Sequence, residues 1–125
     1  MKKRQLPIIF IIVSLLLVVT ACGGDSGDSD GNAAGEELFK TAGDIPCSTC
    51  HTLDGSTLVG PSMQGLGERA AEEIPGMSAE DYIHEAIVDP SAHVVEGYPD
   101  SMPQDYGEKL SEEELNTLVE FLLSQ

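Results

Sequence analysis

The sequence predicts an all-α domain in which three to five helices are joined by long loops. Two segments in the second half of the chain combine an N-terminal cap with apolar residues at the 3.6-residue period of a helix. The segments around them are rich in Gly and Pro, and they lack the apolar–polar alternation of a strand. About 90 residues remain after an atypical N-terminus, which is enough for one small domain.

The predicted helices follow one another along the chain with different local signals. Residues 33–41 are expected to form a short helix with one apolar side. Ser78 can cap a second helix, with the acidic Asp81 at the N3 position, and this helix should end before Pro90. The apolar stripe of the second helix consists of Tyr82, Ile83, Ala86 and Ile87.

The last predicted helix begins at a capping box formed by Ser111 and Glu114. Its apolar face repeats at helical spacing, so this face should be buried against the rest of the domain. The residues of the face are Leu115, Leu118, Val119, Phe121 and Leu122.

The N-terminal segment has the charge and length of an export signal. Lys2, Lys3 and Arg4 precede an apolar run from Leu6 to Val19, and small residues follow it. We therefore expect residues 1–21 to be a signal peptide. The alternative is an uncleaved anchor helix, although the run is shorter than the ~20 residues that span a bilayer.

Cys22 ends the sequence Val19-Thr20-Ala21-Cys22, which resembles the lipobox of bacterial lipoproteins. The resemblance implies that Cys22 is lipidated and becomes the mature N-terminus, and two or more acyl chains give stable anchoring. Residues 22–35 are nearly all Gly, Asp, Ser, Asn and Ala, which predicts a flexible acidic tether. We expect the globular domain, residues 36–125, on the outer face of the cytoplasmic membrane, on its periplasmic or extracellular side.

The pentapeptide Cys47-Ser48-Thr49-Cys50-His51 has the most specific chemistry in the chain. Two thiols three positions apart, followed by an imidazole, are the attachment pattern of c-type haem. Each thiol can form a thioether with a haem vinyl group, and a helical turn brings His51 to the iron as proximal ligand. Export favours this interpretation, because c-type haem is attached outside the cytoplasm. A zinc half-site, a redox dithiol and a Cys47–Cys50 disulfide are the alternatives.

The sixth coordination position of such an iron either receives a second side chain or stays open. Met102 is the best-placed candidate, because Pro99 and Pro103 stiffen its loop between the last two helices. His93 also lies in a loop and is the main competitor, while simple core filling is the alternative role for Met102. The remaining candidates are Met63, Met77 and His84.

The order of Cys47–His51, Gly60-Pro61, Met102-Pro103 and a final amphipathic helix resembles the monohaem class I cytochromes c. The resemblance implies a small cytochrome c fold, with long loops wrapped around one covalent haem c. It also implies that Pro61 orients His51 through its carbonyl and that Met102 is the distal iron ligand. Residues 89–103 are closer still to the cytochrome c domain of haem–copper oxidase subunit II.

The same resemblance implies a contact between the first and last helices. The family packs these helices through a Gly and an aromatic residue before the haem motif, which Gly35 and Phe39 match, with Phe121 as the partner. One departure is the longer distance between Phe39 and Cys47, and we expect residues 43–46 to form an inserted loop there.

The charge of the chain restricts its partners. The chain has 22 Asp and Glu against 6 Lys and Arg, and residues 1–21 hold three of the cations and no acid. The remaining chain, with 3 cations and 22 acids, has a formal charge of −19. This charge argues against nucleic acid as a partner and predicts redox partners with basic docking patches. The alternative is that the acidic residues only make the protein more soluble.

Together these features predict an electron-transfer protein rather than an enzyme. An iron with both axial positions filled exchanges one electron without binding substrate, and the resemblance implies transfer between respiratory or photosynthetic complexes, toward a terminal oxidase. The alternatives are a haem-bearing subunit of a larger redox complex, and a haem sensor or enzyme with an open distal site.

Overall fold

The computed structural model describes residues 27–125, which form helices and loops without a strand. The all-α prediction is therefore confirmed, and the five α-helices of this part of the chain fall within the predicted number. In chain order the elements are α1 (Gly27–Thr41), the 3-10 helix η1 (Cys47–Thr49), α2 (Leu66–Glu73), α3 (Ala79–Val88), α4 (Tyr106–Lys109) and α5 (Glu112–Leu123).

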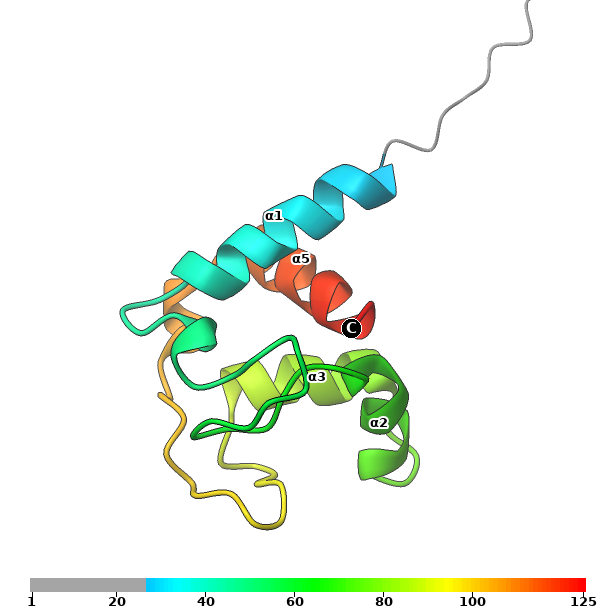
Figure 1. Cartoon of the computed structure of the whole chain (residues 1–125), viewed down its shortest axis with the longest axis vertical. Helices are drawn as coiled ribbons and strands as arrows, with labels where there is room; N and C mark the ends of the chain where they lie inside the picture. Colours follow the sequence, from blue (N-terminus) through cyan, green and yellow to red (C-terminus); the bar gives the residue numbers. More distant parts are fainter. Residues whose placement is uncertain (1–26) are drawn as a thin grey trace, which may run out of the picture.

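Helices α1 and α5 pack on each other, and α5 also contacts α2 and α3 (Figure 1). Two long loops run outside these helices, one between η1 and α2 and the other between α3 and α4. The hydrophobic core lies between the helices and is dominated by α5, which buries all five residues of its predicted apolar face. The loops and α3 leave a hollow beside this core.

The contact between α1 and α5 depends on a glycine. A Cβ atom at Gly35 would overlap the Cβ of Phe121 and would lie 3.0 Å from the Thr117 carbonyl oxygen. The rings of Phe39 and Phe121 pack at a centroid distance of 6.1 Å and an interplanar angle of 51°. The predicted Gly35–Phe39–Phe121 contact is confirmed, despite the longer spacing between Phe39 and the motif.

Helix α1 begins earlier than the sequence predicted. We expected a helix from Ala33 and a flexible tether through residue 35, but the chain is helical from Gly27, so residues 27–35 of the predicted tether are part of α1. The Asn32 amide donates a hydrogen bond of 3.4 Å to the Ser124 hydroxyl, and Gly35 packs against α5. Residues 27–35 have no large apolar side chain that could stabilise a helix, and these contacts with α5 stabilise it instead. The predicted signal peptide (1–21), Cys22 and the start of the tether lie outside the described residues.

The capping predictions for α3 and α5 are confirmed. The Ser78 hydroxyl accepts a hydrogen bond from the Asp81 backbone N–H at 3.1 Å. Ser111 and Glu114 form both bonds of the capping box, with Glu114 Oε2 accepting from the Ser111 backbone N–H at 2.9 Å. Local side chains therefore determine where these two helices begin. Within residues 27–125, no helix has the length and apolar character that a membrane span requires.

Candidate haem site

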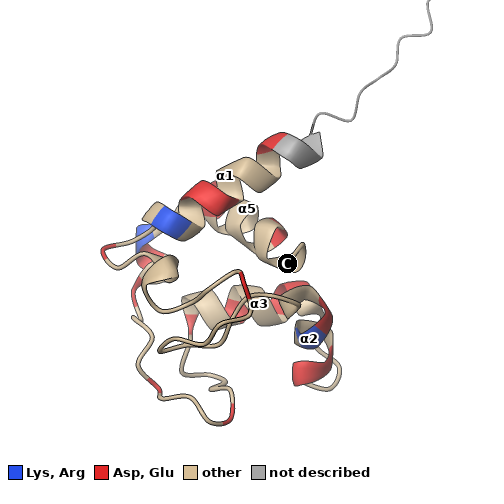
Figure 2. Ribbon diagram, viewed as in Figure 1, with Lys and Arg blue, Asp and Glu red and all other residues tan. Residues whose placement is uncertain are grey.

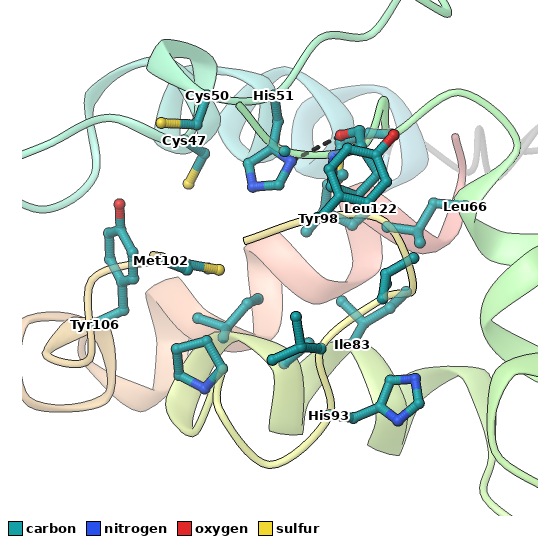
Figure 3. Close-up of a pocket in the computed structure, with 18 of the residues that line it drawn as sticks. Cys47, Cys50, His51, Leu66, Ile83, His93, Tyr98, Met102, Tyr106 and Leu122 are labelled. Carbon is teal, nitrogen blue, oxygen red and sulfur yellow. Dashed lines mark hydrogen bonds between the residues drawn. The ribbon is translucent and has the colours of Figure 1, made fainter. Parts of the chain in front are cut away.

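A large apolar pocket lies beside the core, between the motif segment and α3 (Figure 3). Its walls enclose about 1310 Å³, open solvent at the mouth included. Apolar side chains that line it include Phe39, Ile83, Ile87, Tyr106, Leu118 and Leu122.

The motif enters this pocket through one tight turn. The backbone N–H groups of Cys50 and His51 both donate to the Cys47 carbonyl, at 3.1 and 2.9 Å, as η1 ends. This turn places Cys47, Cys50 and His51 along one wall (Figure 3), as the predicted helical turn requires. Burial raises the pKa of the Cys47 thiol.

The imidazole of His51 is held in one orientation from two sides. Its Nδ1 lies 2.8 Å from the carbonyl oxygen of Pro61, which can only accept, so Nδ1 carries the proton. Nε2 then has its lone pair free on the pocket side, as an iron ligand requires. Gly60 packs directly on the ring, where a Cβ atom would overlap Cε1 and would lie 2.7 Å from Nδ1. The predicted hydrogen bond between His51 and Pro61 is present.

A network of hydrogen bonds fixes the loop that carries Pro61. The Ser62 hydroxyl accepts from the backbone N–H groups of Gly55 and Gln64, at 3.0 and 3.2 Å, and donates to the Thr52 carbonyl at 3.2 Å. Arg69, on α2, donates to the Ser62 carbonyl at 2.8 Å and also to the Gln64 carbonyl. The orientation of His51 is therefore supported by bonds that extend to α2.

Met102 lies on the wall of the pocket that faces His51. Its side chain is half-buried, and its sulfur points into the space below the imidazole (Figure 3). Pro99 and Pro103, which the sequence suggested would stiffen this loop, line the pocket with it. A thioether in this place can approach a metal that is bound to His51 from the other side.

The competing candidates lie in less suitable places. His93 also lines the pocket, but its Nε2 is 3.4 Å from Glu73 Oε1, and its ring packs edge-on against Tyr82 at 5.8 Å. Met63 is 7 % exposed and belongs to the hydrophobic core. The other two candidates are an exposed His84 and a Met77 that packs at the edge of the core.

The pocket and its side chains thus fit a planar group with a central iron. One wall presents two sulfurs and an oriented imidazole, the opposite wall presents a thioether, and the space between is apolar. Comparison with known protein families gives one match, between residues 32–125 and the family described as Cytochrome c. The chain belongs to the cytochrome c family. No curated protein matches the chain significantly.

Membership of the cytochrome c family establishes the cofactor and the fold. The cofactor is a covalently bound c-type haem, and Cys47 and Cys50 fit its attachment site. The helical architecture is that of the cytochrome c fold. Cytochromes c are in general haem-based electron carriers, and their domains typically work outside the cytoplasm. The matched region begins at Asn32, within α1, whereas the sequence placed the start of the domain at residue 36.

Two residues that support this cytochrome c site were missed in the sequence. Arg69 fixes the loop behind His51, and Tyr106 lines the pocket beside Cys47 and Met102 (Figure 3). Both act through backbone carbonyls, Arg69 on the loop just before α2 and Tyr106 on a segment 61 positions away, and such carbonyls leave no residue-type signal. Only the helical pattern around Arg69 could have pointed to its position on α2.

Replacing Gly60 with alanine is expected to displace the His51 imidazole. The new Cβ would occupy space that the ring fills, so the ring must rotate and lose its bond to Pro61. Changes in such supporting contacts weaken a metal ligand by about 10- to 100-fold. The absorption spectrum of the haem-loaded protein should therefore show partial loss of the normal axial ligation, together with a lower ratio of haem to protein.

Gly31→Ala provides the control for this variant, since a Cβ at Gly31 meets no atom within 4 Å. Its spectrum should equal that of the wild type. A wild-type spectrum for Gly60→Ala would show that the contact between Gly60 and His51 does not matter for ligation.

Proposed function

We propose that this cytochrome c is a one-electron carrier whose haem iron is bound by His51 and Met102. The observation that carries the proposal is the placement of the Met102 sulfur across the pocket from the oriented His51 ring. With both axial positions filled, the iron has no free site for a substrate, so the protein is not an enzyme. Haem supplies the redox centre, and Cys47 and Cys50 hold it through thioethers.

The pocket suits fast exchange of a single electron at a raised reduction potential. Thioether ligation and an apolar surrounding both favour ferrous over ferric iron, which carries more charge. The Ser62 and Arg69 bonds hold the His51 side of the pocket in place in both oxidation states. Little rearrangement then accompanies electron transfer.

The surface charge supports partners with basic docking patches and argues against nucleic acid. Acidic residues are spread over the helices and loops of residues 27–125, whereas Lys40, Arg69 and Lys109 are the cations of this part (Figure 2). Lys40 pairs with Glu36, and Lys109 pairs with Asp44 and Asp105. A basic partner would therefore meet a surface whose charges are mostly acidic, and salt should weaken the encounter.

The N-terminal sequence supports a place at the membrane. A signal peptide over residues 1–21 and a lipidated Cys22 would tether the domain to the outer face of the cytoplasmic membrane. Such a tether keeps the carrier concentrated near membrane-bound complexes. The similarity of residues 89–103 to the cytochrome c domain of oxidase subunit II favours a terminal oxidase as the acceptor.

The proposal is tested on the purified haem-loaded protein. The ferric form should show the weak long-wavelength absorption band of methionine-bound haem iron, and the ferrous form should not bind CO readily. Electron transfer to a basic redox protein should slow as salt is added, whereas transfer to an acidic one should not slow. Ready CO binding by the wild type would instead indicate an open site and a sensor or enzyme. Stable co-purification with other subunits would indicate a fixed subunit of a larger complex.

A further inference from the structure

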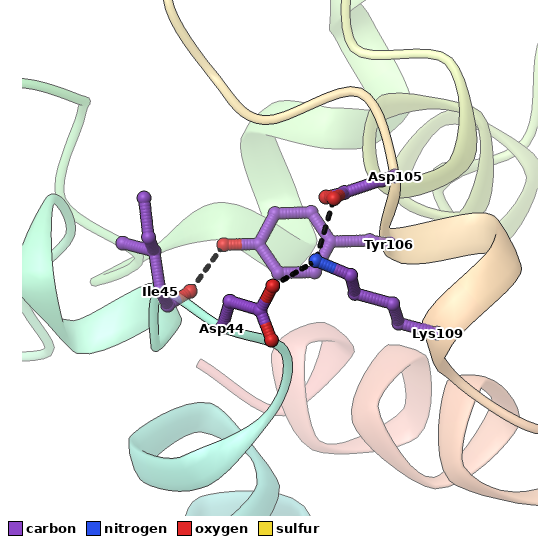
Figure 4. A network of polar contacts seen from close by, with 5 residues as sticks. All are labelled: Asp44, Ile45, Asp105, Tyr106 and Lys109. Atoms are coloured by element: carbon purple, nitrogen blue, oxygen red, sulfur yellow. Dashed lines mark hydrogen bonds and ion pairs between the residues drawn. The ribbon is translucent and has the colours of Figure 1, made fainter.

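The inserted segment before the haem motif makes specific contacts with the region after Met102. Residues 43–46 lie between the end of α1 and Cys47 and are the segment expected above to form an inserted loop. The Tyr106 hydroxyl donates a hydrogen bond of 2.5 Å to the carbonyl of Ile45, across 61 positions of sequence (Figure 4). Lys109 lies between Asp44 and Asp105, at 2.5 and 2.6 Å. The insertion therefore touches α4, which follows directly on the Met102 loop.

Gly43 allows the Tyr106 ring to lie against the insertion. Its φ of +70° favours glycine, and a Cβ atom there would lie 2.7 Å from Tyr106 Cε1. The Tyr106 side chain is only 3 % exposed and lines the haem pocket beside Met102. Burial, as the main cause, raises the pKa of Tyr106 to about 12, so its hydroxyl remains a donor at physiological pH.

Helix α4 needs such a contact to stay in place. It has only four residues, and isolated helices of this length are unstable in water. Tyr106 is the buried residue of α4. The ion pairs of Lys109 are solvent-exposed, and such pairs contribute little to stability. The bond from Tyr106 to Ile45 is thus the principal polar tie between the Met102 side of the pocket and the motif side.

We propose that residues 43–46 are a brace that holds Met102 toward the iron, with Tyr106 as the positioning residue. The inference rests on the proposed ligation by Met102. A thioether is a weak neutral ligand, so an ordered loop must hold it against exchange. The brace joins the segment before Cys47 to the segment after Met102, and it therefore sets the distance between the two walls of the pocket.

The test uses Tyr106→Phe in the full haem-loaded protein, with imidazole as the probe. This substitution keeps the ring and removes the hydroxyl that bonds Ile45. Imidazole binds ferric iron only where Met102 has left, so its apparent affinity reports how firmly Met102 is held. Loss of a hydrogen bond with a net value near 1 kcal/mol should raise that affinity about three- to tenfold. The long-wavelength methionine band should weaken in parallel.

Thr117→Val is the matched control. It also removes one bond from a side-chain hydroxyl to a backbone carbonyl, 2.8 Å to Glu113, but on α5 and away from the haem pocket. Its imidazole affinity should equal that of the wild type, even if it lowers the stability of the fold by a similar amount. Lys109→Gln should change the affinity less than twofold, because its partners are solvent-exposed.

The outcomes separate this inference from the proposed function. A wild-type methionine band with equal imidazole affinity in Tyr106→Phe would overturn the brace and leave Met102 ligation intact. An equal rise of the imidazole affinity in Thr117→Val would also overturn the brace, because the affinity would then follow the general stability of the fold. If the wild-type protein lacks the methionine band, ligation by Met102 fails, and the brace has nothing to hold.

Discussion

Met102→Ala is expected to open one axial position of the haem iron, lower the reduction potential and allow CO to bind. The Met102 sulfur faces the pocket opposite His51, and an alanine at this place cannot reach an iron between the two walls. A ligand that occupies the position in about 99 % of molecules weakens an external ligand about 100-fold. Its removal should therefore increase the CO affinity by a factor of this order, which a CO titration of the ferrous protein measures.

Met77→Ala is the matched control for this experiment. It shortens a half-buried methionine that packs at the edge of the core, so it costs packing without changing the pocket. Its spectrum and potential should match the wild type. If Met102→Ala keeps the wild-type spectrum while His93→Ala changes it, His93 is the distal ligand, and its place beside Glu73 must differ when haem is bound.

The second large effect is expected at the contact between α1 and α5. Gly35→Ala places a Cβ on the Cβ of Phe121, which cannot rotate away because it is attached to the backbone of α5. The helices must separate, and overpacking of this kind costs roughly 1–3 kcal/mol. The gain in helix propensity from Gly to Ala offsets up to about 1 kcal/mol of that cost. Urea unfolding of the haem-loaded protein should show a net loss of about 1–2 kcal/mol.

Gly31→Ala on the same helix shows the propensity effect alone. A Cβ at Gly31 meets no atom within 4 Å, so this variant should gain about 0.5–1 kcal/mol. We therefore expect the free energy of unfolding to fall in Gly35→Ala and to rise in Gly31→Ala. Equal stability changes at both positions would contradict the close contact between Gly35 and Phe121.

The sequence predicted α3 and α5 well because their starts depend on neighbouring side chains. Ser78 and Ser111 each cap a helix through a residue three positions away, and such pairs are visible in the sequence. Helix α2 was missed because its N-cap residue is Gly65, which has a φ of +71° and no side chain that could cap the helix. Helix α4 was missed because its four residues depend on contacts far away in the chain.

The candidate site also contains residues that the sequence reveals and residues that only the structure reveals. Cys47, Cys50 and His51 form a contiguous motif, and Gly60-Pro61 follows closely enough for the resemblance to assign it. The contacts that support these residues are different in kind. Arg69 binds backbone carbonyls of the preceding loop, and Tyr106 binds a carbonyl 61 positions away. Any residue type can supply a carbonyl, so these pairs could only be found in three dimensions.

The contact between Gly35 and Phe121 has a consequence for the order of events during biogenesis. It joins the first and last helices of the domain, and closing so long a loop costs entropy before the contact compensates for it. Contacts between such distant residues are expected to form late. Because α5 supplies Leu118 and Leu122 to the pocket wall, the emerging chain leaves this side uncovered. We therefore expect the thiols of Cys47 and Cys50 to stay accessible for thioether formation until the last helix docks and closes the domain.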